Sequence, residues 1–284
     1  WKHITARNMV QVKVKKPNAV LFDIAGTVAR ESFVEKLLIP YFKVAYRVYL
    51  ENNWSKPECA EAVKKLAEAA EKDSKAPKIQ MGSSKKNNSQ SSVSSSSMKS
   101  PSTTVSRNRK KDAIEQVCRY IQYCMDNEKE TKAYAFFRFQ VWFDGYDRNK
   151  LSTPVYSDVA ITVQRWKNTK AIKLYILSNG WAEASRKFMS KTSHGDLNLV
   201  IDDHFDTSIG PLLNPETFTK VAAKIGQSLA DVIFLTKSAE QGKAAKQAGM
   251  NVILVLTHGP AVDQALEICR DIPIARTFTD IEFV

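Results

Sequence analysis

The sequence predicts an α/β protein with a doubly wound parallel sheet at its core and an inserted helical cap domain. Three observations support this fold class. From residue 155 onward, apolar strands alternate with helices, as in the βα units of a parallel sheet. One more apolar strand, at residues 20–22, lies some 150 residues upstream of the next. The chain between them has a helical period, which indicates an insertion after the first strand.

Residues 1–17 are predicted to form a basic N-terminal tail. They hold five lysines and arginines and no acidic residue, so we interpret them as a solvated segment outside the fold. Residues 18–29 follow and contribute the first strand of the core. That strand is a short apolar run that ends at Asp23, before a turn containing Gly26 and Thr27.

Residues 30–154 are predicted to form the helical cap. Apolar side chains recur three and four positions apart on both sides of a polar stretch. They are Phe33, Leu37, Leu38, Tyr41, Phe42, Ala45, Val48 and Tyr49 on one side, and Ile114, Val117, Cys118, Ile121 and Met125 on the other. The chain has four cysteines and no CxxC pair, so the cysteines are expected to be reduced thiols on helix faces.

A Ser-rich insert at residues 78–108 is predicted to be disordered within the cap. Residues 83–106 include twelve serines among 24 positions, with no acidic and no aromatic residue. Such a segment buries too little apolar surface to offset its loss of chain entropy. Its Ser100-Pro101 pair and the basic run that follows suit protein kinases, although this signal has low specificity.

Residues 155–284 supply the rest of the α/β core. The predicted strand–helix pairs are 172–177 with 182–189, 232–235 with 239–248, and 252–256 with 262–268. In such sheets the chemistry gathers at the carboxyl ends of the strands. These ends carry Asp23, Ser178-Asn179-Gly180, Thr236-Lys237 and Thr257-His258.

An Asp between a buried strand and a Gly-Thr turn suits phosphoryl transfer, because its carboxylate can attack phosphorus and form an aspartyl-phosphate. A hydroxyl or amide at the next strand end can hold phosphate oxygens. Asp23 is therefore the candidate catalytic residue, and Thr27, Ser178, Asn179 and Gly180 are the candidate substrate-binding residues. Two structural alternatives stay open. Asp23 could simply bond the turn amides, and Ser178-Asn179 could simply cap the next helix.

Longer motifs carry a more specific signal. The chain has DIAGTV at residues 23–28, VWFDGYDRNKLSTPVYSDV at 141–159, RWKNTKAIKLYILSNG at 165–180, FDTSIG at 205–210 and IFLTK at 233–237. These stretches resemble motifs of the haloacid dehalogenase superfamily, most closely those of its enolase-phosphatase (acireductone synthase) family. The resemblance covers residues 18 to about 283.

The resemblance implies an Mg²⁺-dependent phosphatase of methionine salvage, which converts 2,3-diketo-5-methylthiopentyl-1-phosphate to the acireductone. It implies that Asp23 is both the nucleophile and a ligand of Mg²⁺. It also implies that Ser178 and Asn179 stand for the family's phosphate-binding Ser-Ser pair.

Four positions depart from the family pattern. Ala25 replaces the second acid of the first motif, Leu212 replaces a lysine, Lys237 replaces the metal-anchoring Asp, and Gln241 replaces an acid nearby. A missing proton carrier typically costs about 10²–10⁴-fold in rate, and a missing charge-stabilising donor about 10²–10³-fold. A lysine at the metal position removes a ligand and adds repulsion.

We therefore expect a catalytically impaired phosphatase that has lost its Mg²⁺ site. The alternative is a pseudophosphatase that acts as a phosphometabolite-binding or protein-interaction module. Lys237 is expected either to form an ion pair with Asp23 or to point to solvent.

The net charge of +12 is concentrated in two segments. Residues 1–17 and 74–111 hold 14 of the 42 basic residues and no acid, so the remainder has 28 basic against 30 acidic residues. These segments are either simply solvated or make weak contacts with nucleic acid or an anionic surface. No apolar stretch reaches the roughly 18 residues of a membrane span. We expect a monomer in the cytoplasm, or alternatively in the nucleus, whose partner is a small phosphorylated metabolite.

Overall fold

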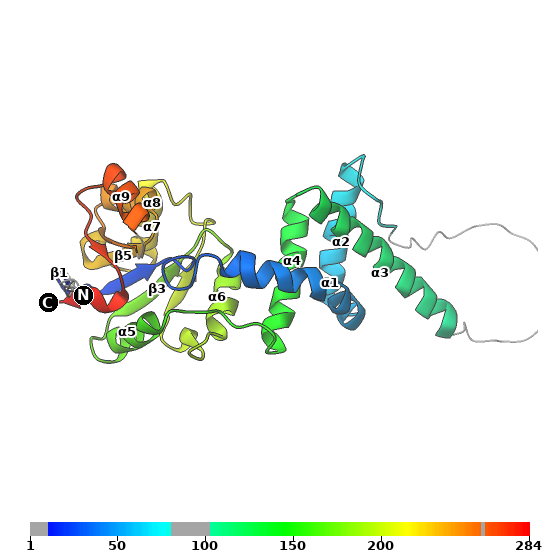
Figure 1. The fold of residues 1–284 in the computed structure, drawn as a ribbon, viewed down its shortest axis with the longest axis horizontal. Coiled ribbons are helices and arrows are strands. Elements are labelled where there is room, and N and C mark those ends of the chain that lie inside the picture. Colours follow the sequence, from blue (N-terminus) through cyan, green and yellow to red (C-terminus); the bar gives the residue numbers. More distant parts are fainter. Residues whose placement is uncertain (1–10, 81–102, 257–258) are drawn as a thin grey trace, which may run out of the picture. The chain divides into compact units, whose positions relative to one another are not determined.

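Figure 1 shows a computed structural model that describes residues 11–80, 103–256 and 259–284. The chain forms two compact units, which we call the α/β unit (up to Leu38, with Arg148–Val284) and the helical unit (Ile39–Asp147). Residues 30–38 and 148–154, which the sequence assigned to the cap, group with the α/β unit. The reason is that both are anchored on Phe188. The ring of Phe33 packs against it at 5.7 Å, and the Thr153 hydroxyl donates to its carbonyl at 2.7 Å.

A six-stranded parallel sheet forms the α/β unit, in the order β4-β3-β2-β5-β6-β7. The strands are β2 (Ala19–Phe22), β3 (Lys173–Leu177), β4 (Asp203–Phe205), β5 (Val232–Thr236), β6 (Asn251–Val255) and β7 (Ile274–Ala275). The first strand of the core lies in the middle, where Ala19 pairs with Lys173 on one side and with Val232 on the other. The predicted doubly wound parallel sheet is confirmed.

Helices cover both faces of the sheet (Figure 1). They are α5 (Ser157–Asn168), α6 (Ala182–Ser190), α7 (Pro215–Lys224), α8 (Ala239–Ala248) and α9 (Gly259–Ile268). Because side chains alternate along a strand, Leu21 joins the apolar cluster that includes Phe218 of α7. On the opposite face Phe22 meets Phe278, whose ring stacks on Trp166 of α5 at 5.6 Å.

The second half of the predicted N-terminal tail is part of the fold. β1 (Val12–Val14) pairs in parallel with β8 (Ile281–Phe283), and the Lys16 N–H donates to the Val284 carbonyl at 3.0 Å. Val12 is buried, whereas Lys13 faces Glu282 at 3.5 Å. The prediction of a solvated tail is thus wrong for this part, because apolar and basic residues alternate along a strand. Residues 1–10 lie outside the described residues.

The helical unit contains α1 (Ile39–Asn53), α2 (Pro57–Lys72), α3 (Thr103–Asp126) and α4 (Lys132–Asp147), and a π-helix at Val34–Leu38 precedes α1. Its core is aromatic, with Phe137 of α4 packed edge-on against Phe42 and Tyr49 of α1 at 6.1 and 5.7 Å.

The four cysteines of the chain are buried free thiols, and burial raises the pKa of Cys59 and of Cys118 to about 11. Within the described residues, no helix combines the length and apolarity that crossing a membrane requires.

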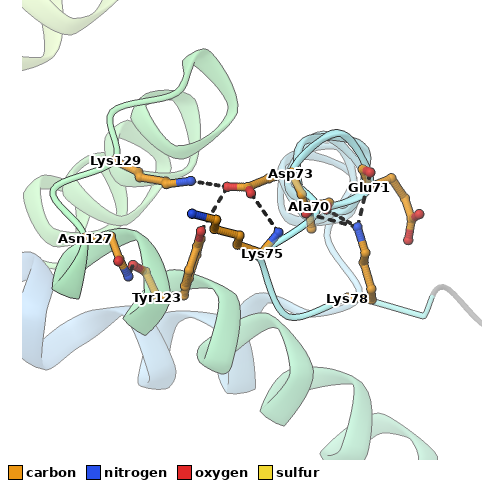
Figure 2. Close-up of polar contacts among 8 residues, drawn as sticks. All are labelled: Ala70, Glu71, Asp73, Lys75, Lys78, Tyr123, Asn127 and Lys129. Carbon is orange, nitrogen blue, oxygen red and sulfur yellow. Dashed lines mark hydrogen bonds and ion pairs between the residues drawn. The ribbon is translucent and has the colours of Figure 1, made fainter.

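Both ends of the predicted disordered insert are ordered, while residues 81–102 lie outside the described residues. Lys78 closes the C-terminus of α2, because its ammonium donates to the carbonyls of Ala70, Glu71 and Asp73 at 2.8, 3.2 and 3.1 Å (Figure 2). Ile79 is buried. Residues 103–108 belong to α3, so the predicted limits of 78 and 108 are too wide.

Asp73 connects the end of α2 to α3 and to the loop after α3 (Figure 2). Its carboxylate pairs with the Lys129 ammonium, and it accepts from the Tyr123 hydroxyl at 3.1 Å and from the Lys75 N–H at 3.0 Å. The bond from Lys129, followed by that from the Lys75 amide, lowers the pKa of Asp73 from 3.8 to about 2. The charged form of Asp73 is therefore the one that holds these segments together.

Asp73→Asn should lower the thermal unfolding midpoint at pH 7. A carboxylate whose pKa is depressed in the fold contributes stability above its ordinary value of 3.8, and this contribution is lost as the pH falls through about 2. The difference between the wild-type protein and the variant should therefore shrink toward pH 2. Glu71→Gln removes the same charge from the same helix end and is the matched control. An equal loss in both variants would contradict a specific role for Asp73.

Candidate active site

Asp23 directly follows β2, the central strand, and is only 7% exposed. Its N–H donates to the Leu235 carbonyl at 3.2 Å, and its Oδ1 accepts from the Ile24 N–H at 2.7 Å. Burial raises the pKa of Asp23 from 3.8 to about 6, whereas the Ile24 amide and the positive charge of Lys237 act in the opposite direction. The structure thus places Asp23, a buried carboxyl with a raised pKa, at the predicted strand end. Its catalytic role stays a prediction.

The turn after Asp23 satisfies its own amides. The Ile24 carbonyl accepts from the N–H groups of Thr27, Val28 and Ala29 at 3.3, 2.9 and 2.9 Å. Gly26 has a φ of 81°, in the left-handed region that favours glycine, and its N–H donates to the Ala29 carbonyl at 2.7 Å. The alternative in which Asp23 bonds the amides of Gly26 and Thr27 is therefore wrong.

Lys237, directly after β5, lies across this turn. Its N–H donates to Thr27 Oγ1 at 3.0 Å, and Thr27 is almost fully buried. Its aliphatic stem covers Gly26 so closely that a Cβ there would overlap Lys237 Cδ and lie 3.0 Å from Cε. Its ammonium forms an ion pair with Glu31. The expected Asp23–Lys237 ion pair is wrong, because a nearer and more exposed carboxylate takes the ammonium.

Ser178, Asn179 and Gly180 follow β3, which neighbours β2, so they reach the same edge of the sheet as Asp23. Ser178 Oγ accepts from the Gly180 N–H at 3.1 Å and thereby shapes the turn, while Asn179 and Gly180 are exposed. Neither Ser178 nor Asn179 is the N-cap of α6, which is Trp181, and the Ala182 N–H donates to Asp206 Oδ2 at 2.8 Å. The capping alternative is wrong for both residues, and phosphate binding by them stays a prediction.

Asp206 itself was missed by the sequence reasoning. Burial raises its pKa, but hydrogen bonds from Ser208 and from the Ala182 amide outweigh this and hold the pKa below its ordinary value. The signal was present in the sequence, since Asp206 is the acid of the retained FDTSIG motif.

Positions 212, 241 and 25, which also depart from the family pattern, carry no charged side chain. Leu212 is 3% exposed and belongs to the apolar cluster that includes Phe205, Phe218 and Phe234, so its side chain contributes to packing. Gln241, in the first turn of α8, is 7% exposed, and its Oε1 has no hydrogen-bond partner among the described residues. The side chain of Ala25 has no oxygen atom.

A pocket of about 680 Å³ opens beside Lys237, and we call it the strand-end pocket. Its lining consists of Gly26, Arg30, Glu31, Ser32, Glu35, Tyr156, Lys237, Val255, Leu256 and Ala261. Burial raises the pKa of Tyr156, and the nearby Arg30 lowers it. The volume suits a small ligand. The sequence did not single out Arg30, Glu31 or Tyr156, because their place depends on the path of the chain after Gly26.

The residues at these strand ends do not fit Mg²⁺. This ion requires a near-octahedral shell of oxygen atoms, and the described residues contain no cluster of three or more His, Cys, Asp or Glu side chains that could hold a metal. Asp23 supplies a single carboxyl here, and one of its oxygens accepts a hydrogen bond from the Ile24 N–H. Position 237, which the resemblance assigns to a second metal ligand, holds a lysine whose positive charge opposes a cation.

Comparison with known proteins gives a consistent result. No protein-family profile matches the chain. Enolase-phosphatase E1 of Xenopus tropicalis is 31% identical over 242 residues, which cover 85% of this chain and 86% of that protein. The protein of the same name from Anopheles gambiae is 28% identical over 270 residues, 95% of this chain and 84% of that one.

Among solved structures, the UTR4 protein of Saccharomyces cerevisiae superposes with a TM-score of 0.57 at 20% identity, covering 92% of this chain and 98% of that one. This likeness shows a shared fold, and the sequence identities to the relatives above show descent. The chain therefore belongs to the enolase-phosphatase E1 family.

Proposed function

We propose that this chain is an enolase-phosphatase family member with impaired phosphatase activity, which binds a small phosphorylated metabolite at the strand-end pocket. One observation carries the proposal. The Lys237 side chain lies across Gly26 and pairs with Glu31, at the strand end where the family places its metal-anchoring carboxylate. By resemblance, the ligand to test first is the family substrate, the diketo phosphate of methionine salvage.

The chemistry of the site supports reduced turnover rather than loss of the nucleophile. With a pKa of about 6, the Asp23 carboxyl is mostly ionised at pH 7, as a nucleophile must be. Asp23 is not among the residues that line the strand-end pocket, so the phosphate of a bound ligand would have to reach past this lining for attack. Ala25 cannot carry the proton that the leaving group requires. The positive charges available to a phosphate in this pocket belong to Arg30 and Lys237, and the latter is already paired with Glu31.

With Mg²⁺ and a small phosphate ester, the purified protein should turn over at least 10³-fold more slowly than the enzyme median of about 10 s⁻¹. The missing proton carrier and the missing metal ligand each remove a separate part of the transition-state stabilisation. Release of inorganic phosphate measures the rate, and Asp23→Asn gives the background. A turnover of about 1 s⁻¹ that Asp23→Asn abolishes would mean that this chain is a working phosphatase.

The second candidate is a pseudophosphatase that binds its ligand without turnover, and the unsuitability of the strand ends for Mg²⁺ favours it. Calorimetric titration of Mg²⁺ should show no binding below millimolar concentrations. Binding of the diketo phosphate without hydrolysis, and equally well with and without Mg²⁺, would support the pseudophosphatase over the impaired enzyme. Sub-millimolar Mg²⁺ binding that disappears in Asp23→Asn would refute the loss of the metal site.

A further inference from the structure

A second hollow lies within the helical unit, between α1 and α3, and we call it the α1–α3 groove. Its volume is about 530 Å³. The lining residues are Arg47 and Glu51 of α1, and Arg107, Asn108, Lys110, Lys111 and Ile114 of α3. Four of these seven side chains are cationic and one is anionic, so the groove carries an excess of positive charge.

Helical geometry brings these cations together. Arg107, Lys110, Lys111 and Ile114 are spaced three, four and seven positions from the first, which places them on one face of α3. Ile114 is only 4% exposed and fixes this face against the unit's core. Positions 47 and 51 are one turn apart on α1, so they also share a face.

Few carboxylates balance these charges. The charge of Arg47 is balanced, because its guanidinium donates to Glu115 Oε2 at 2.9 Å. The Lys110 ammonium donates to the backbone carbonyl of Glu51 at 3.0 Å, near the C-terminus of α1. Within residues 11–80, 103–256 and 259–284, Arg107, Lys110 and Lys111 form no ion pair with a carboxylate. Like charges this close repel one another, and a bound anion would relieve the repulsion.

We propose that the α1–α3 groove binds a compact anion that carries two or more phosphate groups. The guanidinium groups of Arg47 and Arg107 can each donate two parallel hydrogen bonds to a phosphate, and the ammonium groups of Lys110 and Lys111 add charge. Among the described residues, no aromatic side chain lines the groove, so a nucleobase has no ring there to stack on. Recognition therefore depends on the phosphates, and the volume suits a small ligand. This inference involves the helical unit alone and is independent of the function proposed for Asp23.

Calorimetric titration of the full chain with inorganic tripolyphosphate tests the proposal. Saturable binding is expected, which weakens as salt is added. Arg107→Gln should weaken it about tenfold or more, the effect of losing a charge-assisted hydrogen bond. Arg109→Gln is the matched control, because Arg109 is an exposed cation on the same helix that does not line the groove. Its effect should stay within about twofold.

Glu51→Gln removes the one acidic side chain among the described lining residues of the groove and should strengthen binding, a gain that misfolding could not produce. Equal losses in Arg107→Gln and Arg109→Gln, or no saturable binding, would overturn the proposal. A single-stranded RNA whose affinity grows with its length, and which tripolyphosphate fails to displace, would show instead a diffuse nucleic-acid surface.

Discussion

Replacing Gly26 with alanine should lower the free energy of unfolding by more than about 2 kcal/mol. A residue with a Cβ in the left-handed region costs about 1–2 kcal/mol by itself, and Gly26 has a φ of 81°. In addition, the new methyl group would overlap the Lys237 stem. The lysine would have to leave the turn, and its pairing with Glu31 would be lost. Urea-induced unfolding measures the change.

Two variants separate the backbone effect from the overlap. Gly195 has a φ of 88°, and a Cβ on it would meet no atom within 4 Å, so Gly195→Ala reports the backbone cost alone. In a Lys237→Ala background, Gly26→Ala should cost no more than Gly195→Ala, because the overlapping atoms are gone. If Gly26→Ala and Gly195→Ala were equally destabilising in the wild-type background, the Lys237 stem would not lie over Gly26.

Asp23→Asn should stabilise the protein at pH 7 by up to about 3 kcal/mol. The pKa of Asp23 is raised from 3.8 to about 6, and a tenfold change in acidity corresponds to about 1.4 kcal/mol. Between these two values the folded state holds a proton that the unfolded state has released. The stability contributed by that proton is complete below pH 3.8 and is lost as the pH rises through about 6. The advantage of the variant should therefore vanish toward pH 4.

Asp206→Asn is the matched control, because its effect should have the opposite sign. Hydrogen bonds hold the pKa of Asp206 below its ordinary value, so its carboxylate stabilises the fold at neutral pH. Unfolding of both variants at pH 4 and pH 7 gives the comparison. A loss of stability at pH 7 in Asp23→Asn would indicate that the Asp23 carboxylate has a cationic partner, and the metal site would have to be reconsidered.

The sequence predicted the central strands and their helices well, because these are buried apolar runs followed by helical periods. The strand predicted at 232–235 is β5 (Val232–Thr236), and the helix predicted at 239–248 is α8 itself. β4 and β7 were not predicted, since three and two residues are too few to show a period. β1 was not predicted, because the basic residues of this segment were counted and the alternation of apolar and basic residues along it was overlooked.

For the site, topology placed Asp23, Ser178 and Lys237 at one edge of the sheet, and the structure agrees. Side-chain direction could not be predicted in the same way. The partner of Lys237 is Glu31, in a loop whose path depends on the left-handed conformation of Gly26. Likewise, the position of Leu212 in a motif did not reveal that it belongs to the apolar core.

The place of β2 in the sheet also governs when the protein can fold. This strand leaves the ribosome about 150 residues before β3 and still longer before β5, its two hydrogen-bonding neighbours. At roughly 5–20 residues per second, the wait is about 8–30 s. The helical unit, Ile39–Asp147, is synthesised entirely within that interval, so it can begin to fold before β3 emerges. Meanwhile all four residues of β2, which the finished sheet buries completely, stay unpaired. The yield of folded protein should thus depend on translation speed and on chaperones that shield this apolar segment.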